Sequence, residues 1–158
     1  IELIKGNTNA SNQCIQGTAA NDLLDFSATS FALLDYVDGG DGNDTIIGNA
    51  QRNDLRGGAG DDILDGLAGN NTLTGGPGAD VFRFGAEDID GQDIVTDFVA
   101  GLDKADLAAF PNWSFADLMA ATVQRGADSV ITLPSGKKVR LKGTQRSSLG
   151  SGDFLGLA

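Results

Sequence analysis

Glycine and aspartate recur at a fixed spacing of nine between Gly39 and Arg83. Five consecutive units read GGDGNDTII, GNAQRNDLR, GGAGDDILD, GLAGNNTLT and GGPGADVFR. The sixth position is always Asp or Asn, and the eighth is apolar in the series Ile46, Leu55, Leu64, Leu73 and Phe82. Carboxylates together with the carbonyl oxygens of glycine-rich turns are the hard ligands that Ca²⁺ takes six to eight at a time, whereas Mg²⁺ demands a stricter octahedron. The pattern therefore indicates a calcium-binding repeat.

The same spacing predicts how the chain must run to bring these residues together. Three residues around one buried apolar side chain form a short strand, and six glycine-rich residues form a turn. Two units close one coil, so that strands stack in parallel and each turn meets its like two units later. Upstream, the units at 17–25 and 30–38 keep this register after a four-residue insertion. One edge then carries Asp22, Asp44, Asp62 and Asp80, and the other carries Asp35, Asn53 and Asn71.

A column of carboxylates at such spacing repels strongly unless cations lie between its members. A second interpretation is that Asp, Asn and Gly serve here only as turn-forming residues. Five consecutive units in strict register favour the repeat, because self-similarity at a fixed period marks repeat folds.

These units resemble the GGxGxDxUx nonapeptides of RTX proteins, which form a calcium-binding parallel β-roll. The resemblance implies that each ion lies between two successive turns of one edge. The first turn supplies the carbonyls of its second and fourth positions and its aspartate. The next turn supplies the carbonyls of its first and third positions and its aspartate. One implied ligand set is Gly40, Gly42, Asp44, Gly57, Ala59 and Asp62. The second is Gly58, Gly60, Asp62, Gly75, Pro77 and Asp80, and Asp22, Gly76 and Gly78 continue the pattern.

The sequence departs from that pattern on the second edge. Asn53 and Asn71 stand where the family has aspartate, and the unit at 30–35 has no glycine. Neutral side chains bind calcium more weakly, so we expect one occupied edge and one sparse edge.

Composition limits the remaining interpretations. The 158 residues include 23 glycines, one cysteine (Cys14) and no histidine, and the net charge is −11. This charge argues against binding nucleic acid or an anionic membrane. The sequence contains no run long enough to span a bilayer and no signal-peptide pattern at its start. Because it begins at Ile1, we interpret it as part of a larger protein.

The charge divides unevenly along the chain, which indicates two segments. Residues 1–100 carry 17 acidic and 4 basic side chains, whereas residues 101–158 carry 5 and 7. We expect an all-β fold with a right-handed parallel β-roll over residues 1–84 and a β-rich cap with one short helix over residues 85–158. In the cap, residues 114–122 predict the helix, with an S-x-x-D capping pattern, and residues 129–143 predict a hairpin. Asp90 or Asp93 would either complete a last calcium site with Asp80 or serve as a turn residue.

The hairpin also carries a stripe of basic side chains. It comprises Lys138, Arg140 and Lys142, with Lys137 and Arg146 nearby. Such a stripe would hold an anionic polysaccharide through charge-assisted hydrogen bonds. A solvated strand face is the alternative.

Three classes of function follow from these features. The first is a calcium-dependent folding module at the C-terminus of a secreted protein; the ending SSLGSGDFLGLA resembles the tail that addresses RTX proteins to a type I exporter. The second is a polysaccharide-binding module, as in the R-modules of mannuronan C-5 epimerases. The third, an enzyme, lacks support because the sequence has no histidine, nucleophile elbow, phosphate loop or zinc spacing. Oligomeric state is not indicated.

Overall fold

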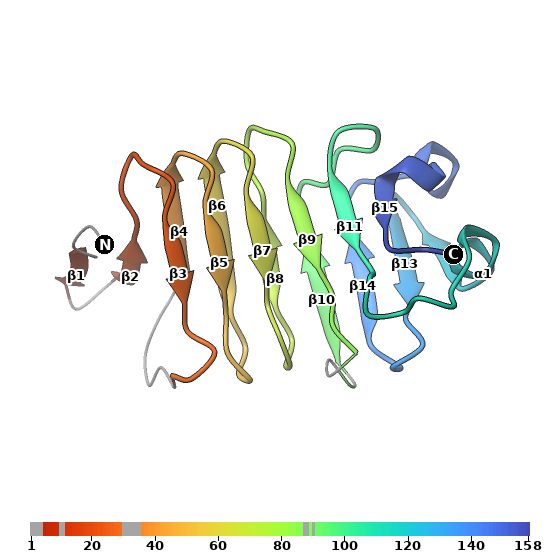
Figure 1. The fold of residues 1–158 in the computed structure, drawn as a ribbon, viewed down its shortest axis with the longest axis horizontal. Coiled ribbons are helices and arrows are strands. Elements are labelled where there is room, and N and C mark those ends of the chain that lie inside the picture. The colour runs from red at the N-terminus through yellow and green to blue at the C-terminus, as the bar shows by residue number, and fades with distance from the viewer. Residues whose placement is uncertain (1–4, 10–11, 30–35, 87–88, 90) are drawn as a thin grey trace.

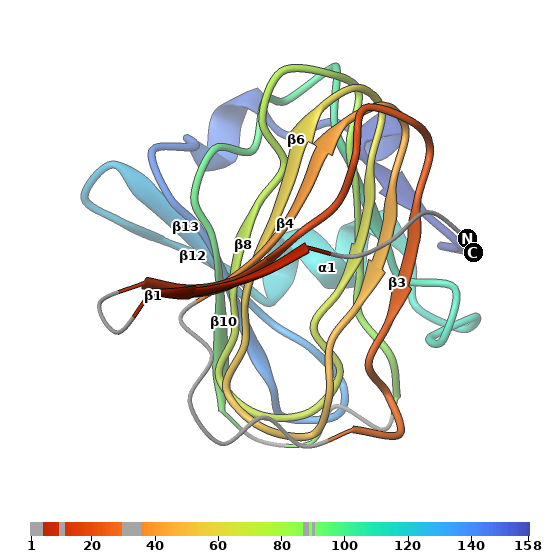
Figure 2. The ribbon, with the colours of Figure 1, turned by 90° about the vertical axis from the view of Figure 1, so that its left-hand side faces the viewer.

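The chain folds into a flattened roll of two β-sheets (Figures 1 and 2). The computed structural model describes residues 5–9, 12–29, 36–86, 89 and 91–158, so Asp35 and Asp90 lie outside the described residues. The nine-stranded sheet contains, in spatial order, β1 (Lys5–Asn9), β2 (Asn12–Gln16), β4 (Tyr36–Asp41), β6 (Asp54–Ala59), β8 (Thr72–Thr74), β10 (Gln92–Val95), β14 (Lys138–Leu141), β13 (Asp128–Thr132) and β12 (Thr122–Arg125). The six-stranded sheet contains β15 (Phe154–Leu155), β11 (Lys104–Asp106), β9 (Val81–Arg83), β7 (Ile63–Asp65), β5 (Thr45–Ile47) and β3 (Leu23–Asp25).

Successive strands of the repeat alternate between the two sheets, and strands of the repeat pair in parallel within each sheet. Leu55 of β6 lies opposite Leu73 of β8, and Leu64 of β7 lies opposite Phe82 of β9. The partners in both pairs are separated by two nonapeptides, so two nonapeptides make one coil. This register confirms the predicted parallel β-roll.

The core of the roll is a double row of eighth-position side chains. Ile46, Leu55, Leu64, Leu73 and Phe82 are all fully buried, at 0% exposure. The flanking residues of each short strand point outward, because side chains alternate between the faces of a strand. Each strand therefore contributes one apolar side chain to the buried row. The turns lie outside this row, at the two edges of the roll.

Insertions lengthen individual turns without disturbing the stack. Leu24 lies opposite Ile46 and Leu73 lies opposite Val95, although each pair is separated by more than two nonapeptides. Phe82 and Ala105 are aligned across a still longer connection. The extra residues are accommodated in the turns, since the core positions keep their alignment.

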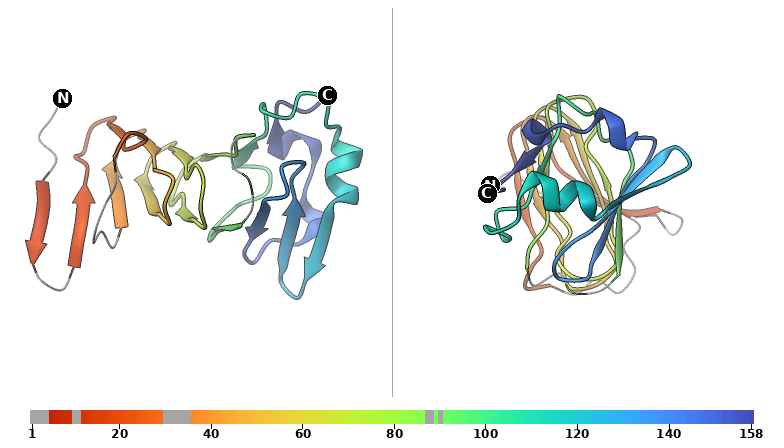
Figure 3. Two further views of the ribbon diagram at one scale, coloured as in Figure 1. Left: turned by 90° about the horizontal axis from the view of Figure 1, so that it is seen from below. Right: turned by 90° about the vertical axis from the view of Figure 1, so that its right-hand side faces the viewer.

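The C-terminal segment closes one end of the roll (Figure 3). Helix α1 (Phe115–Ala120) begins at a capping box formed by Ser114 and Asp117, as predicted. The predicted hairpin is formed by β13 and β14, with Ile131 opposite Val139. Two short 3₁₀ turns, η1 (Arg146–Ser148) and η2 (Ser151–Asp153), precede β15.

Both sheets continue into this segment. Strand β14 adds in parallel to β10, and β15 adds in parallel to β11. The division of the chain at residues 84 and 85 stays a prediction. In the described parts of the chain, no helix has the length and hydropathy that a membrane span requires.

Candidate metal sites between stacked turns

The turns form two edges, which lie at the top and bottom of Figure 1. We call the upper one the aspartate edge; its turns are 17–22, 39–44, 57–62, 75–80 and 97–103. We call the lower one the asparagine edge; its turns are 48–53 and 66–71, followed by the connection that ends at Asp93.

Aspartates along the first edge form a ladder of hydrogen bonds between turns. The backbone N–H of Asp22 donates to Oδ1 of Asp44 over 2.8 Å, and Asp44 donates in the same way to Asp62 over 2.7 Å. The ladder continues from Asp62 to Asp80 over 3.0 Å and from Asp80 to Asp103 over 3.1 Å. One carboxylate oxygen of each acceptor is therefore used to hold neighbouring turns together.

The second carboxylate oxygen behaves differently in the middle of the ladder. Oδ2 of Asp44, Asp62 and Asp80 is buried and has no hydrogen-bond partner among the described residues. Oδ2 of Asp22, in contrast, accepts bonds from the backbone N–H and hydroxyl of Thr18, at 2.7 and 2.9 Å. A buried carboxylate oxygen without a partner is costly unless a cation satisfies it. The three central aspartates thus present oxygens to a positive group.

Backbone carbonyls converge on the same positions. A Cβ placed on Gly57 would lie 2.2 Å from Oδ2 of Asp62 and 2.6 Å from the carbonyl oxygen of Gly75 in the next turn. A Cβ on Gly39 would likewise lie 2.3 Å from Oδ2 of Asp44 and 2.4 Å from the carbonyl oxygen of Gly57. The first glycine of each turn leaves open a space lined by oxygen atoms of two successive turns. A hard divalent cation fits this donor set.

Glycines at the second and fourth positions shape the turn itself. Gly58 and Gly60 have φ angles of 113° and 130°, in the region that residues with a Cβ rarely adopt. Their side-chain positions would also collide with carbonyl oxygens of the preceding turn, at 1.9 and 2.1 Å. Glycine is therefore required for turns to stack this closely.

Burial and neighbouring charges raise the pKa of the central carboxyl groups. The pKa of Asp62 rises to about 6 and that of Asp80 to about 7, in both cases chiefly through desolvation. The carboxylate of Asp44 adds to the pKa shift of Asp62, and that of Asp103 adds to the pKa shift of Asp80. Desolvation also raises the pKa of Asp44 and Asp103. These carboxylates thus destabilise the fold when they are ionised without a cation.

Side chains alone do not complete a metal site. Among the described residues, no three Cys, Asp or Glu side chains gather closely enough to hold an ion. Each inter-turn space is bordered by aspartates of two turns, so the remaining ligands must be backbone carbonyls. This arrangement favours Ca²⁺, which accepts many carbonyl oxygens in flexible geometry.

The structure also changes two parts of the predicted ladder. Asp93 does not complete a site with Asp80, because it lies on the asparagine edge, where its Oδ1 accepts the backbone N–H of Asn71 over 2.8 Å. Asp103 follows Asp80 instead, and Asp97 accepts the backbone N–H groups of Gly75 and Gly76 at 3.0 and 2.9 Å. Sequence spacing missed Asp97 and Asp103 because the nonapeptide period ends before them.

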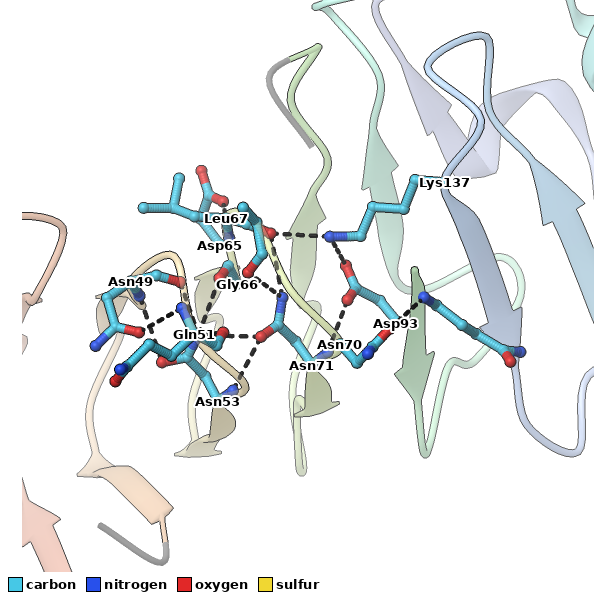
Figure 4. Close-up of polar contacts among 12 residues, drawn as sticks. Asn49, Gln51, Asn53, Asp65, Gly66, Leu67, Asn70, Asn71, Asp93 and Lys137 are labelled. Atoms are coloured by element: carbon cyan, nitrogen blue, oxygen red, sulfur yellow. Dashed lines mark hydrogen bonds and ion pairs between the residues drawn. The ribbon is translucent and has the colours of Figure 1, made fainter. Parts of the chain in front are cut away.

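The asparagine edge has its own ladder (Figure 4). Asn53 donates its backbone N–H to Oδ1 of Asn71 over 3.0 Å, and Asn71 donates to Asp93. The side-chain amide nitrogens of Asn53 and Asn71 are hydrogen-bonded, unlike the second oxygens of the central aspartates, whereas the amide nitrogen of Asn49 is buried without a partner among the described residues. The two edges therefore differ in their hydrogen bonding, and the predicted difference in calcium occupancy stays a prediction.

The basic side chains of the C-terminal segment are not all exposed on one face. Lys137 is fully buried and pairs with Asp93, so its predicted role in an exposed glycan site is wrong. Arg140 pairs with Asp128, and Arg146 donates to the carbonyl of Met119 over 2.7 Å. Lys138 and Lys142 remain exposed.

Because folding raises the pKa of Asp62 and Asp80, the metal-free protein should gain stability as the pH falls from about 8 to about 5. The folded state then binds more protons than the unfolded state, whose aspartates titrate near 3.9. The folded fraction in metal-depleted buffer, followed by circular dichroism, tests this. Replacing both residues with Asn should reduce the pH dependence. A metal-free protein that is more stable at pH 8 than at pH 5 would contradict it.

Comparisons with known proteins agree with this geometry. A family model described as the RTX calcium-binding nonapeptide repeat matches residues 34–64 and 56–88. Among curated protein sequences, none is similar enough to count as a relative. The AlgE6R3 subunit of the Azotobacter vinelandii mannuronan C5-epimerase has a similar solution structure, with a TM-score of 0.56 and 24% identity over 99% of this chain and 86% of that one.

A second solved structure is similar to this chain, with a lower TM-score. The extracellular lipase LipA from Serratia marcescens aligns with a TM-score of 0.47 and 18% identity. The alignment covers 96% of this chain but 24% of the lipase, so the chain spans about a quarter of that protein's length.

The family match, the register of two nonapeptides per coil and the oxygen-lined spaces concern the same turns. Residues 34–88 thus match the RTX calcium-binding nonapeptide repeat, and the described strands from β4 to β9 within this range stack as a parallel β-roll.

Proposed function

We propose that this chain is a non-catalytic module that folds when it binds calcium outside the cell. The observation that carries the proposal is the set of three buried carboxylate oxygens without partners, on Asp44, Asp62 and Asp80. They belong to repeats whose family binds Ca²⁺. Calcium would supply the positive charge that these oxygens lack.

The proposed ligands come from successive turns of the aspartate edge. The turns 39–44 and 57–62 would hold one ion through Gly40, Gly42, Asp44, Gly57, Ala59 and Asp62. The turns 57–62 and 75–80 would hold a second through Gly58, Gly60, Asp62, Gly75, Pro77 and Asp80. Asp62 is shared by both sets. Gly76 and Gly78 would continue the series toward Asp103, whereas Thr18 already occupies the second oxygen of Asp22.

Calcium would act as a switch because the metal-free roll is poorly stabilised. Its strands bury one apolar side chain each, many glycines lose conformational freedom on folding, and the aspartates along one edge repel each other. Each site filled at ten times its dissociation constant adds about 1.4 kcal/mol to the stability of the folded state. Sites that share an aspartate should fill cooperatively.

A calcium switch would also suit export by a type I system. Extracellular calcium modules bind at roughly 10⁻⁴ to 10⁻³ M, so the chain would stay unfolded inside the cell and fold after export. The proposed export signal at the C-terminus is part of the fold: Phe154 is buried, and β15 pairs with β11. An exporter would have to recognise this tail before folding. We propose that the protein is secreted.

A calcium titration should produce a steep gain of strand signal near millimolar concentration. The physical reason is that the aspartate edge carries uncompensated charge until the ions bind. Circular dichroism measures the transition, and magnesium at equal concentration is the control, since it keeps more of its water and demands an octahedral site. A complete strand signal in excess chelator would show that calcium does not switch folding.

Replacing Asp62 with Ala should remove more bound calcium than replacing Asn71 with Ala. Asp62 belongs to both proposed ligand sets, whereas the amide nitrogen of Asn71 donates to the carbonyl of Leu67 over 3.1 Å. Equilibrium dialysis with elemental analysis counts the ions per chain. Equal losses in the two variants would contradict the assignment of the ions to the aspartate edge.

We propose an anionic polysaccharide as a second, weaker ligand. An open groove on the outer face of the nine-stranded sheet is lined by Gln92, Val123, Arg125, Val130, Thr132, Lys138 and Arg140. Three of these side chains are cationic, and they lie where β10, β14, β13 and β12 are adjacent. Charge-assisted hydrogen bonds to carboxylates would hold the polymer. The buried Lys137 takes no part in this proposal.

Titration with alginate oligomers at low salt should shift amide resonances within residues 137–146 of the calcium-loaded protein. The shifts should shrink as salt screens the exposed charges. Lys138→Ala should weaken binding, and a neutral oligosaccharide serves as the control. Unmoved resonances in this range would remove the glycan role.

A further inference from the structure

The inter-turn spaces of the asparagine edge are occupied by nitrogen atoms of the chain itself. The side-chain nitrogen Nδ2 of Asn53 lies 3.0 Å from the carbonyl oxygen of Asn49, 2.8 Å from that of Gln51 and 3.2 Å from that of Gly66. It also lies 3.0 Å from Oδ1 of Asn71. Four oxygens from two successive turns thus surround one amide nitrogen (Figure 4).

Asn53 stands at the same position of its turn as the aspartates of the opposite edge. Those aspartates present an unpartnered oxygen at this place, whereas Asn53 presents N–H donors. The amide nitrogen carries two N–H donors, which these four oxygens share. The Nδ2 of Asn71 donates within its own turn, to the carbonyl oxygens of Leu67 and Ala68 at 3.1 and 3.4 Å.

Beyond Asn71, a lysine from the C-terminal hairpin enters the stack. The ammonium group of Lys137 lies 2.9 Å from Oδ2 of Asp93 and 2.9 Å from the carbonyl oxygen of Leu67. Oδ1 of the same Asp93 accepts the backbone N–H of Asn71. The ammonium therefore lies between two successive turns and contacts one oxygen of each.

The burial of this lysine makes the arrangement unusual. The side chains of Lys137 and Asp93 are 0% and 1% exposed. A buried ammonium group is retained only when carboxylate and carbonyl oxygens replace its water. Lys138, its neighbour in the sequence, is exposed to solvent. One lysine of the hairpin is thus placed in the interior of the roll's edge, while its neighbour stays on the surface.

We propose that Lys137 takes the place of a metal ion at the last inter-turn position of the asparagine edge. The side-chain amide of Asn53 fills the position before it, so neither of these two described positions binds calcium. The charges agree with this division. Two aspartates on the first edge require a divalent cation, whereas the pair Asn71 and Asp93 carries one negative charge and is balanced by one ammonium.

This arrangement also fixes the C-terminal segment to the roll. Lys137 precedes β14, which adds in parallel to β10. An ion pair inside the edge specifies where the hairpin joins, because a shift in register would move the ammonium away from Asp93. Only the expected number of bound ions rests on the proposed calcium binding of the aspartate edge; the role of Lys137 does not.

Lys137→Met in the full chain at saturating calcium should lower the melting temperature by roughly 10 °C, because it removes the ammonium group that pairs with a buried carboxylate. Lys138→Met is the matched control and should leave the melting temperature nearly unchanged. Adding Asp93→Asn to Lys137→Met should recover part of the loss. Equal melting temperatures for the two lysine variants would overturn the proposal.

Calcium counting provides a second measurement. Asn71→Asp alone should bind no additional ion, since the ammonium still occupies the space, whereas Asn71→Asp combined with Lys137→Met should bind one more than the parent. An extra ion in the single variant, or none in the double variant, would overturn the proposal. If the parent itself binds no calcium, the proposed function fails, but the two lysine variants still decide the role of Lys137.

Discussion

Oxygen atoms crowded between stacked turns are the constraint on which this fold depends. A coil of the regular repeat consists of only two nonapeptides, and its turns approach so closely that a Cβ on Gly58 would lie 1.9 Å from a carbonyl oxygen of the preceding coil. Carbonyl and carboxylate oxygens from successive turns consequently meet at both edges. Positive or hydrogen-bonding groups must lie between them, because buried oxygens otherwise lose the solvation they had in water.

The two edges meet this requirement in different ways. On the aspartate edge, Asp62 and Asp80 leave buried oxygens that nothing in the described chain satisfies. On the asparagine edge, Asn53 supplies its own donors, and Lys137 supplies an ammonium. The oxygens of the aspartate edge therefore require a bound cation, whereas side chains of the protein itself satisfy those of the asparagine edge.

This asymmetry suits a module that must respond to calcium and still have a defined fold. In the proposed switch, the hydrophobic row through Leu55 and Leu64 would not by itself offset the repulsion along the aspartate edge. The asparagine edge adds no such repulsion, and its last ion pair places the C-terminal hairpin. Calcium would then control folding through one edge, while the other determines how the end of the roll is closed.

The sequence determined the repeat, the two-sheet roll and the division into an aspartate and an asparagine edge, because a nine-residue period fixes which side chains face inward and which turns stack. It also determined the capped helix at Ser114, since capping is local. Only the tertiary structure decided that Asp103 follows Asp80, that Asp93 joins the asparagine edge and that Lys137 is buried beside it. These contacts form after the period has ended, where insertions of irregular length and pairing between distant strands set the neighbours.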